Sequence, residues 1–234
     1  MRKTKFAQGE HYHIFNRGNN KQNIFLNDRD YARFLFLILH LQSENVFTNI
    51  SYSISYFIKH RVFIKIKNEN KFSKNKVVNL ISFTLMPNHF HMILEELAKD
   101  GISNYMQRIQ NAYTKYFNDK YDKIGHLLQG PFKDVHIENN GQLLYLSCYV
   151  HKNPKELKSW RSKEYLYEWS SYWDYIKGNR WGQLLVPNII LDQFKNISEY
   201  KNFVTQSSAK ENLEEKYIIN MEWLYNEHSV FINS

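Results

Sequence analysis

The chain has 234 residues, of which 43% are hydrophobic and 23% charged, and this balance predicts a folded globular protein. Its single cysteine excludes an internal disulfide framework and a cysteine-rich zinc site, and no apolar run approaches the ~20 residues that cross a bilayer. We therefore expect a cytoplasmic protein with no membrane partner. A net charge of +8 and 16% aromatic residues favour a nucleic acid partner, although AT-rich coding would give a similar lysine-rich composition.

The N-terminal residues predict a strand, a turn and a helix in that order. Residues 11–16 alternate between residue types that favour strands. Residues 17–22 predict a turn that carries two cations, Arg17 and Lys21. The helix is expected over residues 27–42, because an Asn-Asp cap precedes apolar residues at helical spacing.

The middle of the chain predicts mainly strands. Residues 51–66 are rich in β-branched and aromatic types, which favours one or two strands, and residues 67–76 predict a flexible basic loop. Residues 77–86 and 89–95 predict two consecutive strands, because the Pro87-Asn88 pair interrupts the apolar pattern between them.

The last part of the chain predicts mainly helices. One covers residues 103–118, and another starts at residue 139 or 140 and ends before Pro154, with a short strand at 135–137 between them. Two short helices are expected near 189–205 and 208–226. The order of elements indicates an α+β fold with a ferredoxin-like antiparallel sheet, helices packed on one face, and a C-terminal helical extension.

His89-Phe90-His91 is the most informative triplet in the sequence. Side chains alternate along a strand, so His89 and His91 point to one face, ~7 Å apart, while Phe90 points to the other. Two imidazoles at this spacing suit one metal ion. The alternative is a pair of half-exposed histidines on a polar sheet face.

Tyr149 and Asn153 share one face of the predicted helix that ends at Pro154, because they are four residues apart. The phenol of Tyr149 and the amide oxygen of Asn153 can therefore reach the same site. Since the chain has 17 tyrosines, Tyr149 can equally be a packing residue. Position alone does not separate these two interpretations.

Leu85-Met86-Pro87-Asn88-His89-Phe90-His91 resembles the HUH motif of single-tyrosine transposases, and it is most similar to the branch called REP-associated tyrosine transposases. Further stretches agree with that family in order and approximate spacing. They are Tyr12-His13-Ile14-Phe15-Asn16-Arg17-Gly18, Tyr113-Thr114-Lys115-Tyr116-Phe117-Asn118, Gly125-His126-Leu127-Leu128-Gln129-Gly130, Tyr149-Val150-His151-Lys152-Asn153-Pro154 and Trp169-Ser170-Ser171-Tyr172.

The resemblance implies roles for four residues. His89, His91 and Asn153 become ligands of a divalent metal, Mg²⁺ or Mn²⁺, and Tyr149 becomes the nucleophile that forms a 5′-phosphotyrosine link during DNA transposition. It further implies a catalytic domain over residues 1–180, with 44–76 as an insertion or hairpin, and an extension over residues 181–234. The expected substrate is single-stranded DNA that contains a hairpin, and the protein acts as a monomer or homodimer in the nucleoid.

Five cations are candidates for contacts with DNA phosphates, each with a solvated surface cation as the alternative. They are Arg17, Lys21, Arg108, Lys115 and Lys133. The family often carries an arginine where this chain has Pro131, so Lys133 is the nearby substitute. His151 is interpreted as a surface residue. Two other functions stay open, namely a replication or conjugation nickase and a non-cleaving binder of hairpin DNA or RNA.

Overall fold

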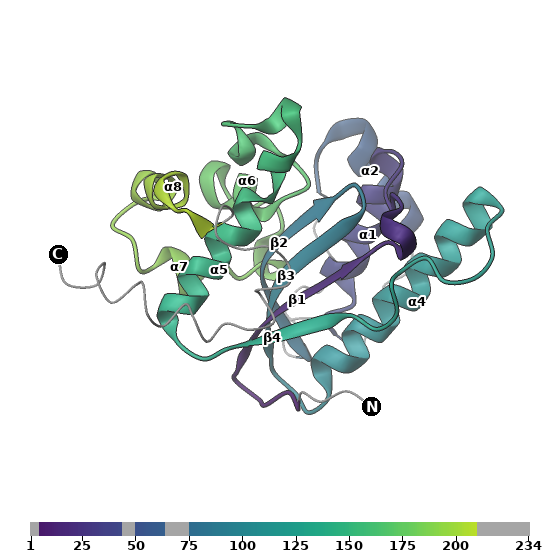
Figure 1. Cartoon of the computed structure of the whole chain (residues 1–234), viewed down its shortest axis with the longest axis horizontal. Coiled ribbons are helices and arrows are strands. Elements are labelled where there is room, and N and C mark those ends of the chain that lie inside the picture. Colours follow the sequence, from purple (N-terminus) through teal and green to yellow (C-terminus); the bar gives the residue numbers. More distant parts are fainter. Residues whose placement is uncertain (1–4, 44–49, 64–74, 210–234) are drawn as a thin grey trace.

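The computed structural model describes residues 5–43, 50–63 and 75–209 (Figure 1). Its sheet is four-stranded and antiparallel throughout, in the order β2-β3-β1-β4. The strands are β1 (His11–Arg17), β2 (Val78–Met86), β3 (His89–Glu96) and β4 (Lys133–Ile137). The α-helices in the described part are α1 (Asp28–His40), α2 (Ile50–His60), α4 (Gly101–Tyr121), α5 (Asn140–Lys152), α6 (Ser171–Lys177), α7 (Asn188–Leu191) and α8 (Ile197–Gln206). The short 3₁₀ segments are η1 (Asn19–Lys21), η2 (Asn153–Glu156), η3 (Lys158–Trp160), η4 (Glu164–Leu166) and η5 (Gly182–Leu184).

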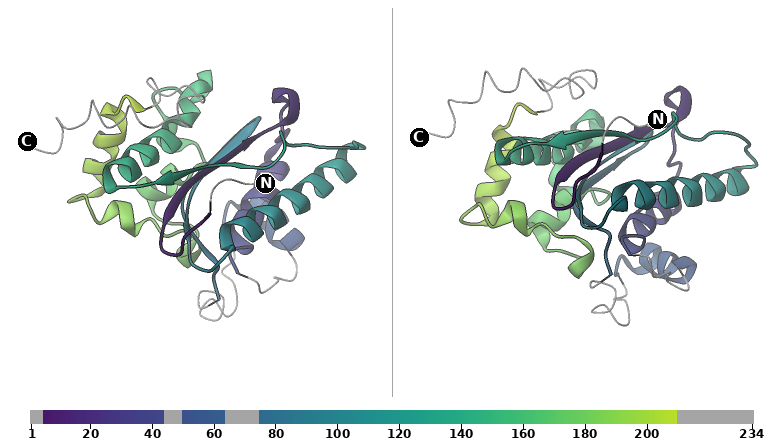
Figure 2. Two further views of the ribbon diagram at one scale, coloured as in Figure 1. Left: turned by 60° about the horizontal axis from the view of Figure 1, so that its bottom comes forward. Right: turned by 90° about the horizontal axis from the view of Figure 1, so that it is seen from below.

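The sheet is covered on both faces. Helices α1, α2 and α4 lie on one side and α5 to α8 on the other (Figure 2). Alternation along β3 assigns its residues to these layers, because Phe90 packs on Phe34 of α1 while His91 packs on Tyr149 of α5. The α+β class and the antiparallel sheet are confirmed, but helices cover both faces of the sheet rather than the one face expected. The second helical layer explains why β2 and β3 are buried almost throughout rather than alternating in burial.

Residues 50–60 form the helix α2, so the prediction of strands in this part of 51–66 is wrong. Ile54 and Phe57 are buried three residues apart on one face of the helix, which packs against α1. β-branched and aromatic residues form a helix when tertiary packing stabilises it more than their weak helix propensity disfavours it. The basic loop predicted at 67–76 falls largely outside the described residues, as does most of the helix predicted at 208–226.

The helix starts follow from side-chain caps. The Asn27 side chain accepts hydrogen bonds from the first turn of α1, and Asn139 does the same for α5. Helix α4 begins at Gly101 rather than at the predicted Ser103, because the Glu96 carboxylate accepts hydrogen bonds from the Gly101 and Ile102 amides. No helix among the described residues is both long and apolar enough to cross a bilayer.

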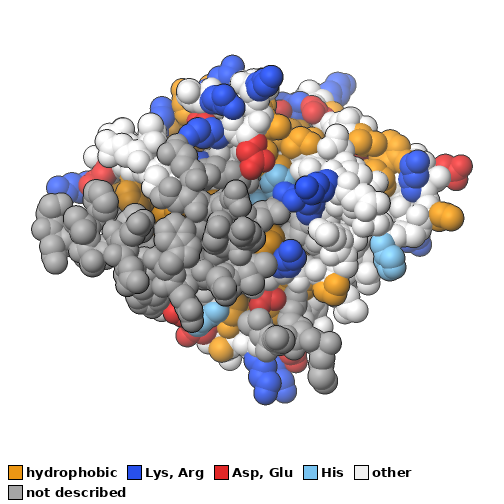
Figure 3. Space-filling model, viewed as in Figure 1, with side chains coloured by type: hydrophobic (Ala, Val, Ile, Leu, Met, Phe, Trp, Pro, Cys, Tyr) orange, Lys and Arg blue, Asp and Glu red, His pale blue; other side chains and the backbone are white. Residues whose placement is uncertain are grey.

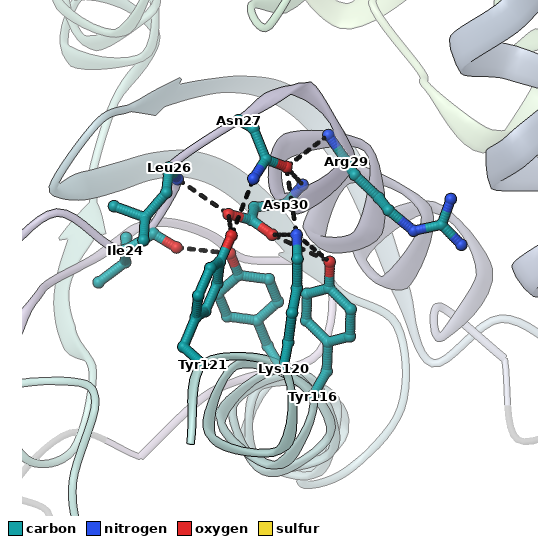
Figure 4. A network of polar contacts seen from close by, with 9 residues as sticks. Ile24, Leu26, Asn27, Arg29, Asp30, Tyr116, Lys120 and Tyr121 are labelled. Atoms are coloured by element: carbon teal, nitrogen blue, oxygen red, sulfur yellow. Dashed lines mark hydrogen bonds and ion pairs between the residues drawn. The ribbon is translucent and has the colours of Figure 1, made fainter. Parts of the chain in front are cut away.

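A polar network joins α1 to α4 on the face away from α5 (Figure 4). The Asp30 carboxylate is buried and accepts hydrogen bonds from Lys120 at 2.6 Å, Tyr121 at 2.7 Å, Tyr116 at 2.9 Å and the Leu26 amide at 2.9 Å. Burial alone would raise the pKa of Asp30, but these hydrogen bonds outweigh it and hold the pKa below its ordinary value. The carboxylate therefore stays charged inside the fold.

Candidate active site

The turn between β2 and β3 is fixed by the segment that follows β1. The Ile24 amide donates to the Pro87 carbonyl at 2.8 Å, and the Gly18 amide donates to the Asn88 carbonyl at 2.8 Å. Only glycine fits at position 18, because a Cβ there would lie 2.2 Å from a backbone oxygen. This close approach sets where His89 begins the next strand.

His89 has a defined tautomer in this structure. Its Nδ1 lies 2.6 Å from Oδ1 of Asn88, whose amide nitrogen donates to the Lys21 carbonyl. A contact this short needs a hydrogen, so Nδ1 is protonated and donates. The acceptor nitrogen is then Nε2, which lies 3.5 Å from Oδ1 of Asn153.

Asn153 is oriented by the way α5 ends. The Asn153 backbone amide bonds to the Val150 carbonyl, so the Tyr149 carbonyl accepts the Asn153 side-chain amide instead, at 2.8 Å. Pro154 has no N–H with which to continue the helix. With its nitrogen engaged, Asn153 directs its oxygen toward His89.

Tyr149 lies against the histidines. Its ring packs edge-on to His91, with centroids 5.3 Å apart, and to His13, with centroids 5.8 Å apart. The rings of His89 and His91 are 5.1 Å apart. The structure thus brings together the two imidazoles, the phenol and the amide that the sequence singled out.

His13 is a member of this cluster that the sequence analysis did not single out. Its Nε2 lies 3.0 Å from Nδ1 of His91, and its ring stacks on Phe15 at 5.0 Å. The signal that could have found it is the alternation along residues 11–16, which places His13 and Phe15 on one face of β1.

The prediction that His151 is a surface residue is wrong. Its side chain is fully buried, with Nδ1 2.7 Å from the Tyr200 hydroxyl of α8 and Nε2 2.8 Å from the Ser171 hydroxyl of α6. Burial lowers the pKa of His151 to about 3. Because both ring nitrogens are engaged away from Tyr149, His151 is not a base for that phenol.

Three of the five candidate cations belong to segments that adjoin the site. Arg17 pairs with His89 across the β1–β3 ladder, Lys21 lies beside Asn88, and the Lys133 ammonium is 6.0 Å from the ring of Phe15. The space-filling view shows histidine side chains beside Lys and Arg side chains near the centre of this face (Figure 3).

The other two candidates, Arg108 and Lys115, lie on α4, which covers the opposite face of the sheet. Arg108 is half-buried, and its guanidinium donates hydrogen bonds to the Leu41 and Ser43 carbonyls, which follow the last residue of α1. Lys115 is exposed and lines a cleft of about 620 Å³ between α1, α2 and α4. The other cations that line it are Arg29, Arg33 and Lys120.

The site residues fit a divalent cation by the chemistry of their donors. Within residues 5–43, 50–63 and 75–209 no group of three or more His, Cys, Asp or Glu side chains is arranged to hold a metal. Nε2 of His89 and Oδ1 of Asn153 are nevertheless two acceptor atoms that face each other at 3.5 Å. Neighbouring ligands of an octahedral cation with bonds of ~2.1 Å lie ~3 Å apart, so a small inward shift accommodates one.

Comparison with known proteins agrees with this geometry. A family model described as "Transposase IS200 like" matches residues 56–153, which include both histidines of the triplet, Tyr149 and Asn153. The match supports the resemblance to single-tyrosine transposases that the motifs carry. Strand β1 lies outside the matched residues.

Among the solved structures that share the fold is that of a REP-associated tyrosine transposase bound to a REP hairpin. It has 13% sequence identity and a TM-score of 0.50, and the alignment covers 76% of this chain and 85% of that one. At this identity the likeness establishes the fold alone. A search of curated proteins finds no relative of this chain.

Proposed function

We propose that this protein cleaves and rejoins single-stranded, hairpin-containing DNA through a 5′-phosphotyrosine intermediate. The observation that carries the proposal is the contact of Tyr149 with His91, one helical turn from the Asn153 oxygen that faces His89. A phenol, two imidazoles and an amide converge here from α5 and β3. The hairpin bound by the structural neighbour suggests the form of the substrate.

The phenol oxygen of Tyr149 attacks the scissile phosphorus and loses its proton as the new bond forms. The bond from phosphorus to the 3′-oxygen breaks, so a 3′-hydroxyl leaves and a 5′-phosphotyrosine remains. The phosphotyrosine keeps the energy of the phosphodiester, and a second 3′-hydroxyl can reverse the step and join strands without ATP. In this proposal His89 and Asn153, whose Nε2 and Oδ1 are 3.5 Å apart, lie next to the reacting phosphate.

A divalent cation held by His89, His91 and Asn153, Mn²⁺ or Mg²⁺, would supply positive charge to the phosphate. Arg17, Lys21 and Lys133 are proposed to contact neighbouring phosphates, because they lie at the same end of the sheet. Lys115 is proposed to contact DNA on the opposite face, while Arg108 is the weakest candidate because its guanidinium binds backbone carbonyls.

Cleavage within one chain is favoured, because Tyr149 contacts His91 of its own chain. His89 and His91 are 5% and 1% exposed, so the site must open to admit a strand. We further propose that residues 1–180 form the catalytic domain and residues 181–234 an extension. The hydrogen bond between His151 and Tyr200 then joins that extension to α5.

The test is incubation of the full chain with Mn²⁺ and labelled hairpin oligonucleotides taken from the flanks of its own gene. We expect a covalent adduct that survives denaturation and is absent with a chelator. Tyr149→Phe should abolish the adduct, whereas Tyr52→Phe, at a tyrosine that is 66% exposed, should leave it unchanged. An adduct in Tyr149→Phe would show that the nucleophile is another residue.

The paired substitution His89→Ala/His91→Ala should abolish cleavage and leave hairpin binding largely intact. Gel-shift assays measure binding, and denaturing gels measure the adduct. If the wild-type chain binds hairpins but forms no adduct with Mn²⁺ or Mg²⁺, it is a non-cleaving binder and the proposed reaction is wrong.

A further inference from the structure

We propose that His13 is a positioning residue for His91: its Nε2 accepts a hydrogen bond from Nδ1–H of His91 and so leaves Nε2 of His91 as the nitrogen that binds the metal. The metal part of this inference and the direction of the hydrogen bond rest on the proposed function. The contact between the two rings is a property of the chain without metal.

The geometry requires that the two rings share one hydrogen. Nε2 of His13 and Nδ1 of His91 are 3.0 Å apart, and the rings are nearly parallel, with centroids 5.1 Å apart at 17°. Both side chains are buried, at 0% and 1% exposure. Two bare nitrogens at this distance would repel and two N–H groups would collide, so one donates to the other.

The proposed metal gives the direction of this bond. Nδ1 of His91 faces His13, so metal binding by His91 would use Nε2. A neutral imidazole that binds through Nε2 carries its hydrogen on Nδ1, and His91 is therefore the donor. His89 follows the same pattern, because Asn88 holds its Nδ1–H and its Nε2 faces Asn153.

Neighbouring strands hold His13 in place. It lies on β1, which pairs directly with β3, and Phe15 stacks on both His13 and His91, at 5.0 Å and 5.7 Å. Partners that fix the tautomer of a metal-binding histidine typically change metal affinity by 10–100-fold. We expect His13 to have an effect of that size.

The first test reads the tautomer in the metal-free, full-length protein by ¹⁵N shifts of the histidine rings, with His91 assigned through His91→Gln. We expect His91 to be protonated on Nδ1. In His13→Phe, which keeps a stacking ring but has no nitrogen, this preference should be lost. A wild-type His91 protonated on Nε2 would overturn the inference.

The second test measures Mn²⁺ affinity by calorimetry. His13→Phe should lose 10–100-fold, and His13→Gln should recover most of it, because the glutamine oxygen can reach the place of Nε2. His13→Asn, which is one bond shorter, should not recover it. Equal Mn²⁺ affinity in the wild type and in His13→Asn or a folded His13→Phe would refute the positioning role.

The two proposals fail in different ways. If the wild type binds no Mn²⁺ and forms no adduct, the proposed reaction fails, while the tautomer measurement still decides whether His13 fixes His91. If the wild type forms the adduct with His91 protonated on Nε2, the reaction stands and the role of His13 is wrong.

Discussion

At the scale of single residues, His40 and His151 are both buried, and burial lowers the pKa of His40 to about 4 and that of His151 to about 3. In the unfolded chain these groups titrate near 6.5. The unfolded state therefore takes up protons below that pH and the folded state does not. Their contribution to stability is complete above pH 6.5 and is lost as the pH falls toward the folded pKa values.

We predict that the free energy of unfolding falls below pH 6.5 by about 1.4 kcal/mol per pH unit for each of these histidines. Urea denaturation at several pH values between 7 and 5 measures this slope. His151→Gln should reduce this slope by about 1.4 kcal/mol per pH unit, the contribution of one proton, whatever its effect on stability at pH 7. An unchanged slope would show that His151 titrates normally in the fold.

Asp30 contrasts with the two buried histidines, because it is buried in its charged form and its carboxylate is hydrogen-bonded. Asp30→Asn should cost about 2 kcal/mol at pH 7, since the charged bond to Lys120 is lost. The pKa of Asp30 is lower in the folded state than in the unfolded chain, where it is about 4. The difference in stability from wild type should therefore persist above about pH 4, and it should be lost as the pH falls from there through the lower, folded pKa. Urea denaturation of both chains measures it.

Asp119→Asn is the control for Asp30, because Asp119 is an exposed carboxylate on α4, next to Lys120 in the sequence. It should change stability by less than about 0.5 kcal/mol. A comparable loss of stability in both variants would mean that the change in net charge, rather than the buried Asp30 network, destabilises Asp30→Asn.

At the scale of elements, the sequence predicts those whose ends carry a local signal. The Asn caps of α1 and α5 and the Pro87-Asn88 turn are short-range features, and each lies where it was predicted. Helix α2 has no such signal, and its helical state depends on packing of Ile54 and Phe57 against distant residues. Alternation along β1 gives the face on which His13 lies, but its contact with His91 depends on the pairing of β1 with β3.

Phe57 tests whether packing holds α2 in place. It is 1% exposed and contacts Phe36 of α1 and Trp181, with ring centroids 5.6 Å and 5.5 Å apart. Phe57→Ala should cost about 3–5 kcal/mol of stability, measured by urea denaturation, because it leaves a cavity between elements. Tyr52→Ala, on the exposed face of α2, should cost under about 1 kcal/mol.

At the scale of the whole molecule, the two faces of the sheet carry different groups. The α5 face holds the histidine cluster with Lys133 nearby, and the α4 face holds the Asp30 network and the cationic cleft. The sequence supplied His89, His91, Tyr149 and Asn153 of the first face, but it did not indicate that Arg108 and Lys115 lie on the second.

Salt dependence of hairpin binding tests which cations contact DNA. Each phosphate contact contributes about one unit to the slope of log K against log salt. Lys133→Ala should lower that slope by about 1, measured by fluorescence anisotropy at several salt concentrations. Lys177→Ala, an exposed cation at the end of α6, should leave it unchanged. Equal slopes in wild type and Lys133→Ala would remove Lys133 from the interface.

One turn of α5 supplies both the proposed nucleophile Tyr149 and the oxygen of Asn153. Adding or deleting a single residue between them would rotate one relative to the other by ~100° about the helix axis. Such a change would separate the two groups even if every other residue were retained. The number of residues in this turn is therefore constrained independently of which residues occupy it.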